Sequence, residues 1–294
     1  MFKIAICIPA YNEENSIEKI IKKSKSYSEL VVVCDDGSDD NTSKIAKSAG
    51  ALVLKHEINC GKGAAMKTLF NYCREKNIDV MITIDGDGQF LPDEIPKILS
   101  PILEKKCDVV IGFRYDNSLE MPKYRKVGNK MLDKFTNLAS DLSFRDTQGG
   151  FRAYSKNAIN KINFSTNGFG VDSEILIDAA KKGLKIQEES VTVIYKTGNK
   201  TSTKDPIAHS GEVIISLIEL IAIHHPLKLL GIPGFILMIV GIILATNVIT
   251  LFNEDRYFSI PLTLGSIGSI TIGLILLLMS VVLFTISKTS KHNN

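Results

Sequence analysis

The chain has 294 residues, and 35 Lys and Arg against 32 Asp and Glu give it a formal net charge of +3 at pH 7. This length allows one large domain or two, and so balanced a charge argues against nucleic acid as a partner. The five cysteines, all within the first 107 residues, are typical of small buried side chains in a reducing compartment. Neither a disulfide framework nor a cysteine metal site is expected, and the start of the chain carries no secretory signal pattern.

The first 115 residues alternate short apolar runs with helix-like segments. Strands are predicted at 4–8, 30–34, 51–55, 80–84 and 108–112, and helices near 14–26, 41–49, 62–76 and 93–105. This alternation predicts an α/β fold with a doubly wound, mostly parallel sheet and helices on both faces. In such sheets ligands bind outside the carboxyl ends of the strands. Three polar loops, which follow residues 8, 34 and 84, fall at those ends.

The middle of the chain is less regular. Helices are predicted at 122–140 and about 172–182, and a strand at 191–195 leads into a basic segment at 196–204. Residues 207–225 are apolar except for a narrow polar stripe at helical spacing. We interpret this stretch as a helix lying at a membrane surface. A core helix packed on the soluble domain is the alternative.

Two uncharged segments follow, at 231–252 and 257–287. About 20 apolar residues suffice to cross a bilayer, so two transmembrane helices are predicted, at about 231–252 and 260–286. Lys228 flanks the first, and Lys288 and Lys291 flank the second. The positive-inside bias then places both termini and the soluble part in the cytoplasm. A buried helical pair in a globular domain is the alternative. The predicted domains are therefore 1–204, an interfacial helix at 205–228, and a membrane hairpin at 229–289.

The segment 83–89, Thr-Ile-Asp-Gly-Asp-Gly-Gln, ends the apolar run at 80–84. Side chains alternate along a strand, so Asp85 and Asp87 point the same way, followed by Gln89 if the chain stays extended. Oxygen ligands of this kind suit Mg²⁺ or Mn²⁺, whose coordination is often completed by substrate phosphates. A strand-to-turn exit is the alternative, because Asp and Gly are common turn residues.

The other loops at this edge carry polar and aromatic side chains. After the first strand, Tyr11 is suited to stack on a base and Glu13 to accept from its donors, although a capped helix start explains the same residues. After the second strand, Asp35 and Asp36 are suited to hold ribose hydroxyls or a base edge, as an acid does at this place in dinucleotide folds. The third loop, 59–65, puts glycines and Lys62 at a helix start, which suits pyrophosphate but lacks the P-loop spacing.

Five motifs in this order resemble glycosyltransferase family 2, in its dolichyl-phosphate mannose synthase and polyprenyl-phosphate glycosyltransferase branch. They are Pro-Ala-Tyr-Asn-Glu-Glu, Asp-Asp-Gly-Ser, Gly-Lys-Gly, Asp-Gly-Asp-Gly-Gln and Asp-Thr-Gln-Gly-Gly-Phe-Arg. The resemblance covers about residues 4–204, and a two-helix membrane tail also occurs in that branch. It implies a glycosyltransferase A type fold and a metal-dependent, inverting hexosyl transfer from a UDP- or GDP-hexose to a polyprenyl or dolichyl phosphate.

The resemblance also implies roles for individual residues. The nucleoside would be held by Pro9, Tyr11, Glu13 and Asp35 or Asp36. Asp85 would lie near the ribose and diphosphate, while Asp87 and Gln89 would ligate Mg²⁺ or Mn²⁺, with Asp85 beside them. Arg114 matches a basic position near the donor. The position at which the family binds phosphate corresponds here to Lys196, Lys200 and Lys204, although their spacing departs from the family's pattern. The alternative is that these lysines form an exposed, solvated run of charge.

The expected mechanism is electrostatic. A bound metal would neutralise the leaving nucleoside diphosphate, and Lys62 and Arg114 would add stabilisation. A lipid phosphate is already largely anionic at pH 7 and needs little help from a base. If a base acts, Asp146 is the first candidate, ahead of Asp172 and Glu174; a salt bridge from Asp146 to Arg145 or Arg152 is the alternative.

Two competing functions remain open. One is sugar transfer to a glycerolipid or a growing glycan, for which a base is essential and the basic segment dispensable. The other is a non-catalytic membrane component that binds nucleotide sugar.

Overall fold

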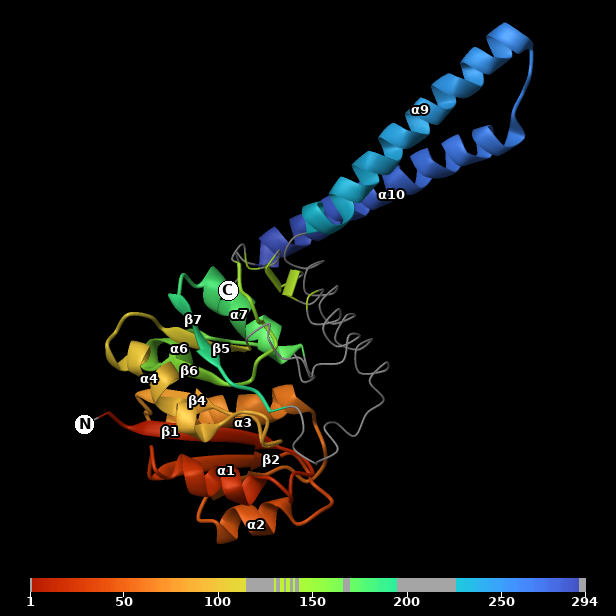
Figure 1. Cartoon of the computed structure of the whole chain (residues 1–294). Coiled ribbons are helices and arrows are strands. Elements are labelled where there is room, and N and C mark those ends of the chain that lie inside the picture. The colour runs from red at the N-terminus through yellow and green to blue at the C-terminus, as the bar shows by residue number, and fades with distance from the viewer. Residues whose placement is uncertain are drawn as a thin grey trace. The chain divides into compact units, whose positions relative to one another are not determined.

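The structure, a computed structural model, describes residues 2–114, 143–165, 170–194 and 226–290, together with scattered positions between 130 and 140. The chain divides into two compact units, residues 1–217 and 218–294 (Figure 1). The described positions between 130 and 140 are helical. The predicted interfacial stretch at 207–225 and the basic segment at 196–204 lie outside the described residues.

The first unit alternates strands and helices through most of its length (Figure 1). Its elements are β1 (Ile4–Ala10), α1 (Ile17–Ser24), β2 (Leu30–Asp35), α2 (Thr42–Ser48), β3 (Leu52–Lys55), α3 (Lys62–Glu75), β4 (Val80–Thr83), η1 (Pro92–Glu94), α4 (Ile95–Leu103), β5 (Val109–Arg114), β6 (Arg152–Ser155), α6 (Lys156–Lys161), α7 (Val171–Lys181) and β7 (Ile186–Val191).

The seven strands form one sheet in the order β3-β2-β1-β4-β6-β5-β7. β1 pairs in parallel with both β2 and β4, so the loops that follow these three strands share the carboxyl edge of the sheet. Within the described sheet, β6 is the strand that runs against its neighbours, β4 and β5. The predicted doubly wound, mostly parallel sheet is therefore confirmed.

Helices cover both faces because the central strands are apolar on both sides. In β1, Ala5 and Cys7 pack with α3, α6 and α7, while Ile6 and Ile8 pack with α1, α2 and α4. Alternate side chains of one strand thus enter two different cores, as the period of two requires.

The sequence-based prediction was wrong at two places in the second half of the sheet. β6 and α6 were not predicted, and the last strand is β7 at Ile186–Val191 rather than 191–195. Beyond it, Val193 makes only an isolated bridge to Phe90. Among the described strands, β7 pairs with β5 alone, at the sheet edge, and its side chains are mostly half-buried. A strand of this kind needs no continuous apolar run, which is the signal on which the prediction relied.

The second unit contains two helices that are long and apolar enough to cross a membrane, Leu227–Asp255 and Ile260–Ile286, each with a mean hydropathy of 2.6. The first begins with a π-helical turn, Leu227–Gly231, and continues as α9 (Ile232–Asp255); the second is α10 (Ile260–Ser290). They form a hairpin and pack on one another (Figure 1).

Small residues let the two helices of the hairpin approach closely. Gly234 and Gly273 face one another, so that a Cβ on Gly234 would lie 2.9 Å from the Gly273 carbonyl oxygen. Ser266 Oγ donates to the Gly241 carbonyl oxygen at 2.9 Å. Close backbone approach through small residues and interhelical hydrogen bonds is how helices associate where water provides no driving force.

We predict that Gly241→Ala destabilises the hairpin. The added Cβ would meet Ile270 Cγ1 at 2.6 Å, the Ile270 backbone nitrogen at 2.9 Å and the Ser266 carbonyl oxygen at 3.0 Å, an overlap that typically costs about 1–3 kcal/mol. Thermal unfolding of the full chain in detergent, followed by helical circular dichroism, should show a lower midpoint. Gly268→Ala is the matched control, because nothing lies within 4 Å of its added Cβ. Equal midpoints for the two variants would contradict the packing.

Candidate functional site

Charged side chains from three segments of the chain meet at the carboxyl edge of the sheet. Asp85 lies just beyond β4, Lys62 is the first residue of α3, and Asp172 lies in the first turn of α7. Lys62 Nζ lies 3.0 Å from Asp85 Oδ1 and 2.9 Å from Asp172 Oδ2. The Lys62 and Asp172 side chains are only 15% and 7% exposed. One ammonium group therefore contacts two carboxylates in a region largely closed to water.

This cluster determines the protonation state of Lys62. Burial alone would lower the pKa of its ammonium group, but the charges of Asp172 and Asp85 outweigh that effect and raise the pKa above its usual value. Lys62 is therefore a fixed positive charge beside Asp85, as an anion-binding role requires.

The antiparallel strand β6 brings a glycine pair against Asp85. Because β6 runs against β4, the residues that precede it, Gly149 and Gly150, lie at the carboxyl end of β4. Thr83 Oγ1 donates to the Gly150 carbonyl oxygen at 2.9 Å. A Cβ on residue 150 would overlap the Asp85 carboxylate, so glycine is needed for this close approach.

The predicted metal ligands share one tight turn. The Gln89 N–H donates to Asp87 Oδ1 at 2.9 Å, and Gly88 has a left-handed backbone with φ +76°. Ser16 Oγ ties the turn to the start of α1 by donating to the Gly86 carbonyl oxygen at 2.6 Å. The turn thus presents carboxylate and amide oxygens, a donor set that suits a hard divalent cation.

The pKa of Glu13 is affected by the charges of this turn. Its Oε2 accepts from Ser16 Oγ at 3.1 Å. Burial, followed by the charge of Asp87 and then that of Asp85 and Asp40, raises the pKa of Glu13 to about 7. The carboxylates of Asp87 and Asp85 therefore lie close enough to repel the negative charge of Glu13, which fits the binding of a divalent cation there.

Both acids of the second loop hold backbone in place. Asp35 accepts from the Ser38 N–H at 2.9 Å and from the Ser43 hydroxyl. Asp36 accepts from the Gly61 N–H at 2.7 Å and contacts His56 Nδ1 at 2.6 Å. Both residues are buried, with at most 3% of their surface exposed. They fix the shape of the loops predicted to hold the nucleoside.

The side chains of the first loop, after β1, are more exposed than Asp35 and Asp36. β1 continues through Pro9, which is buried and lies opposite Cys34 in the parallel register. Tyr11 and Glu13 follow as partly exposed residues. The start of α1 is held by backbone N–H groups that donate to hydroxyls of the second loop: Asn12 to Ser38 Oγ at 2.9 Å and Glu13 to Thr42 Oγ1 at 2.8 Å.

Arg114 and Asp146 form a bidentate ion pair, with Nε–Oδ2 at 2.5 Å and Nη2–Oδ1 at 2.6 Å. The alternative expected for Asp146 was a salt bridge to Arg145 or Arg152; Asp146 does form a salt bridge, but its partner is Arg114. Burial alone would raise the pKa of Asp146, but the Arg114 guanidinium and several N–H donors hold it below its usual value. A carboxylate in this state is a weak proton acceptor.

The other two carboxylates considered as bases are also engaged. Asp172 binds Lys62, as described above, and Glu174 Oε1 accepts from the Ser165 N–H at 2.8 Å and from its hydroxyl at 3.0 Å. In the described part of the chain, each of the three candidate bases is therefore engaged by a cation or by hydrogen-bond donors.

Sequence reasoning missed the structural role of Arg152, the first residue of β6. Its side chain is fully buried, and its guanidinium donates to the carbonyl oxygens of Gly149, Thr147 and Asp172, each at 2.8 Å. These three bonds join the loop before β6 to α7, which carries Asp172. An arginine between the apolar residues Phe151 and Ala153 was the available signal, because a buried charge requires internal partners.

Asp133 is a second residue that the sequence did not single out. Its Oδ1 accepts from the Thr147 N–H at 2.8 Å and from Thr147 Oγ1 at 2.7 Å. Burial raises the pKa of Asp133 to about 6, although the two Thr147 donors oppose that shift. Asp133 therefore supports the loop that carries Asp146.

Comparison with known proteins shows that this chain is similar to sugar transferases. The glycosyl transferase family 2 model matches residues 5–162. The chain is 34% identical over 215 residues to the UDP-N-acetylglucosamine–dolichyl-phosphate N-acetylglucosaminyltransferase of Methanococcus voltae, covering 65% of this chain and 86% of that relative. It is 29% identical over 219 residues to the dolichyl-phosphate hexose transferase of Haloferax volcanii, covering 74% and 92%.

A similar fold occurs in a solved structure, that of Mycobacterium tuberculosis glucosyl-3-phosphoglycerate synthase in complex with Mn²⁺, UDP and phosphoglyceric acid. The TM-score is 0.59 at 22% sequence identity, and the match covers 74% of this chain and 78% of that one. At this identity the comparison supports the fold.

The raised pKa of Glu13 predicts a pH-dependent loss of stability. The folded state, with a pKa of about 7 against 4.5 for the ordinary group, binds more protons than the unfolded state between these values. Glu13 therefore lowers the free energy of unfolding as pH rises from about 4.5 to 7. In urea titrations at pH 5 and pH 8, Glu13→Gln should reduce this loss by up to about 3 kcal/mol.

Glu18→Gln is the control, since Glu18 makes an exposed ion pair with Lys22 and its side chain is 57% exposed. A pH dependence that is the same in wild type and Glu13→Gln would contradict the prediction.

Proposed function

The chain belongs to glycosyl transferase family 2, and we propose that it is a membrane-anchored inverting hexosyltransferase that uses a nucleotide sugar and a polyprenyl phosphate of the dolichyl type. The observation that carries the proposal is the acidic turn at 85–89 beside the fixed cation of Lys62, in a chain that also has two helices apolar enough to cross a membrane. The two relatives described above are both named for transfer to dolichyl phosphate, which supports this acceptor class.

The donor would bind at the carboxyl edge of β1, β2 and β4. Pro9, Tyr11 and Glu13 would face the nucleoside, and Asp35 and Asp36 would shape its pocket. Lys62 would meet the diphosphate, because it is a fixed positive charge at the start of α3, where backbone N–H groups also favour anions. A uridine or a guanosine diphosphate hexose is compatible with these residues; the solved structure with the similar fold contains UDP.

Asp85, Asp87 and Gln89 fit a divalent cation, Mg²⁺ or Mn²⁺. Two observations support this assignment: their oxygen donor set, and the contribution of the Asp87 and Asp85 charges to the raised pKa of Glu13. The solved structure with the similar fold contains Mn²⁺. When bound, such a cation supplies Lewis-acid neutralisation of the leaving diphosphate. Arg114, held in place by Asp146, would add a second positive charge near the donor.

The state of the three candidate bases favours a phosphate acceptor over a sugar hydroxyl. Asp146 is paired with Arg114, Asp172 with Lys62, and Glu174 accepts from Ser165. A hydroxyl nucleophile needs a base to take its proton, whereas a phosphate monoester with a second pKa near 6 is already largely anionic at pH 7. Transfer to polyprenyl phosphate would therefore proceed without a dedicated base.

Lys196, Lys200 and Lys204 remain the proposed acceptor-phosphate residues, although they lie outside the described residues. The catalytic domain at 1–204, the interfacial helix at 205–228 and the hairpin at 229–289 also remain proposals. We also propose that the catalytic domain and both termini are cytoplasmic, which the basic residues that flank the apolar helices support.

Nucleotide-sugar turnover is the direct test of the proposed acceptor. Membranes that contain the full chain should transfer hexose from one member of a panel of UDP- and GDP-sugars only when polyprenyl phosphate is added. The lipid product, measured by extraction and mass spectrometry, should carry one hexose phosphodiester. Turnover with a glycerolipid instead would support the competing enzyme, and binding of a donor without turnover would support a non-catalytic protein.

We predict that Asp87→Asn lowers transfer by more than about a hundredfold, because the site loses a charged ligand of the cation that stabilises the leaving group. Initial rates should be measured across a Mg²⁺ and Mn²⁺ titration. Asp93→Asn is the matched control: Asp93 lies on η1, and its side chain is 55% exposed. Full activity of Asp87→Asn with a chelator present would refute the metal assignment.

A further inference from the structure

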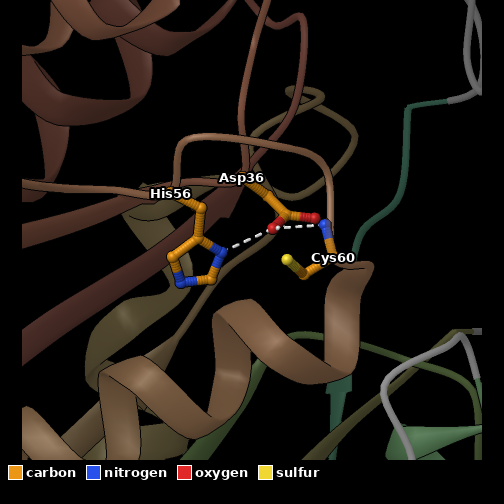
Figure 2. A group of neighbouring side chains, drawn as sticks. All are labelled: Asp36, His56 and Cys60. Atoms are coloured by element: carbon orange, nitrogen blue, oxygen red, sulfur yellow. Dashed lines mark hydrogen bonds and ion pairs between the residues drawn. The ribbon is translucent and has the colours of Figure 1, made fainter.

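A second group of ligand-type side chains lies at the same sheet edge, on its outer strands. β2 and β3 pair in parallel with Asp35 opposite Lys55, so the next residues, Asp36 and His56, are neighbours beyond the strand ends. The loop 56–61 then returns Cys60 to this point, where its N–H donates to Asp36 Oδ1 at 3.1 Å. Figure 2 shows the three side chains converging.

Their ligand atoms are already close together. One carboxylate oxygen of Asp36, one ring nitrogen of His56 and the Sγ of Cys60 all lie within 4.8 Å of one another. His56 Nδ1 is 2.6 Å from Asp36 Oδ1. Asp36 is buried, His56 is partly buried and Cys60 is exposed, so an ion from solvent can reach the group from the Cys60 side.

The surrounding contacts orient these ligands. The Gly61 N–H holds Asp36 Oδ2 at 2.7 Å, and His56 Nε2 lies 2.8 Å from Thr68 Oγ1. A metal-binding imidazole usually donates its other ring N–H to a fixed acceptor, which sets its tautomer and orientation. Thr68 is placed to be that acceptor.

We propose that Asp36, His56 and Cys60 bind a transition-metal ion of the Zn²⁺ class. A thiolate, an imidazole and a carboxylate form a typical borderline-soft donor set, and three protein ligands leave one tetrahedral position for water or another ligand. The set differs from the oxygen ligands of Asp85, Asp87 and Gln89, which favour Mg²⁺ or Mn²⁺. The assignment does not depend on the proposed sugar transfer.

Binding requires only proton movements. The Cys60 thiol releases its proton to solvent and becomes a thiolate. When the ion binds Nδ1, the proton that Nδ1 of the neutral ring shares with Asp36 Oδ1 is released to solvent. Nε2 takes up one proton from solvent, so the ring stays neutral, and Thr68 Oγ1 accepts a hydrogen bond from it. No oxidant or reductant takes part. The spacing of the cysteines gave no sign of this site, because its other two ligands are not cysteines.

Cobalt spectroscopy tests the proposal on the full chain in detergent. Co²⁺ bound to a thiolate gives a near-ultraviolet charge-transfer band, which a site with oxygen ligands alone cannot give. Titration of the reduced wild type with Co²⁺ should produce this band, and Zn²⁺ should abolish it by displacement. Cys60→Ser should lose the band, and Thr68→Val should weaken Co²⁺ binding about tenfold to a hundredfold.

Two control variants identify the thiol. Cys107→Ser should retain the band, because Cys107 belongs to the buried core. Cys34→Ser should also retain it: Cys34 Sγ lies 3.7 Å from His56 Nε2, but burial raises the pKa of this thiol to about 12. The absence of a band in the wild type, its persistence in Cys60→Ser, or its loss in Cys34→Ser would overturn the assignment. Helical circular dichroism confirms that each variant is folded.

Discussion

The ion cluster in which Lys62 bridges Asp85 and Asp172 is the interaction on which the candidate site depends. It joins the end of β4 to the starts of α3 and α7, so three separate segments of the chain are fixed by one ammonium group. In a region this buried, removing one partner would leave charges without compensation, at a typical cost of about 3–5 kcal/mol. The same arrangement keeps a positive charge beside the acidic turn without a mobile side chain.

The antiparallel strand β6 makes this cluster possible. A parallel strand at that position would carry its preceding loop to the opposite edge of the sheet, away from Asp85. Because β6 is reversed, Gly149 and Gly150 reach the carboxyl edge, and Arg152 ties their loop to the backbone of Asp172. The fully buried guanidinium is tolerated because three carbonyl oxygens satisfy it. Site geometry and sheet topology are therefore set by the same residues.

The sequence predicted the parts of the fold that depend on local pattern. Continuous apolar runs located β1, β2 and β4, and with them the edge where Asp85 and Lys62 lie. It did not locate β6, which begins with Arg152 and ends with Ser155 and so shows no apolar run, or β7, whose single neighbour among the described strands leaves it half-buried. Ion pairs between residues distant in sequence could not be predicted either. The pairs Arg114–Asp146 and Lys62–Asp172 depend on how strands and helices are ordered in space, and local sequence spacing does not encode that order.

These pairings give the site its chemical character. Each carboxylate that spacing alone made a candidate base is neutralised by a partner or held by donors, so the site stabilises charge and is poorly equipped to accept a proton. Glu13 differs from these carboxylates, because burial and the nearby charges of the acidic turn raise its pKa. A cation that binds at this turn would relieve that repulsion and favour the ionised form of Glu13. An acceptor that arrives already anionic suits such a site, because its attack requires no proton transfer to the protein.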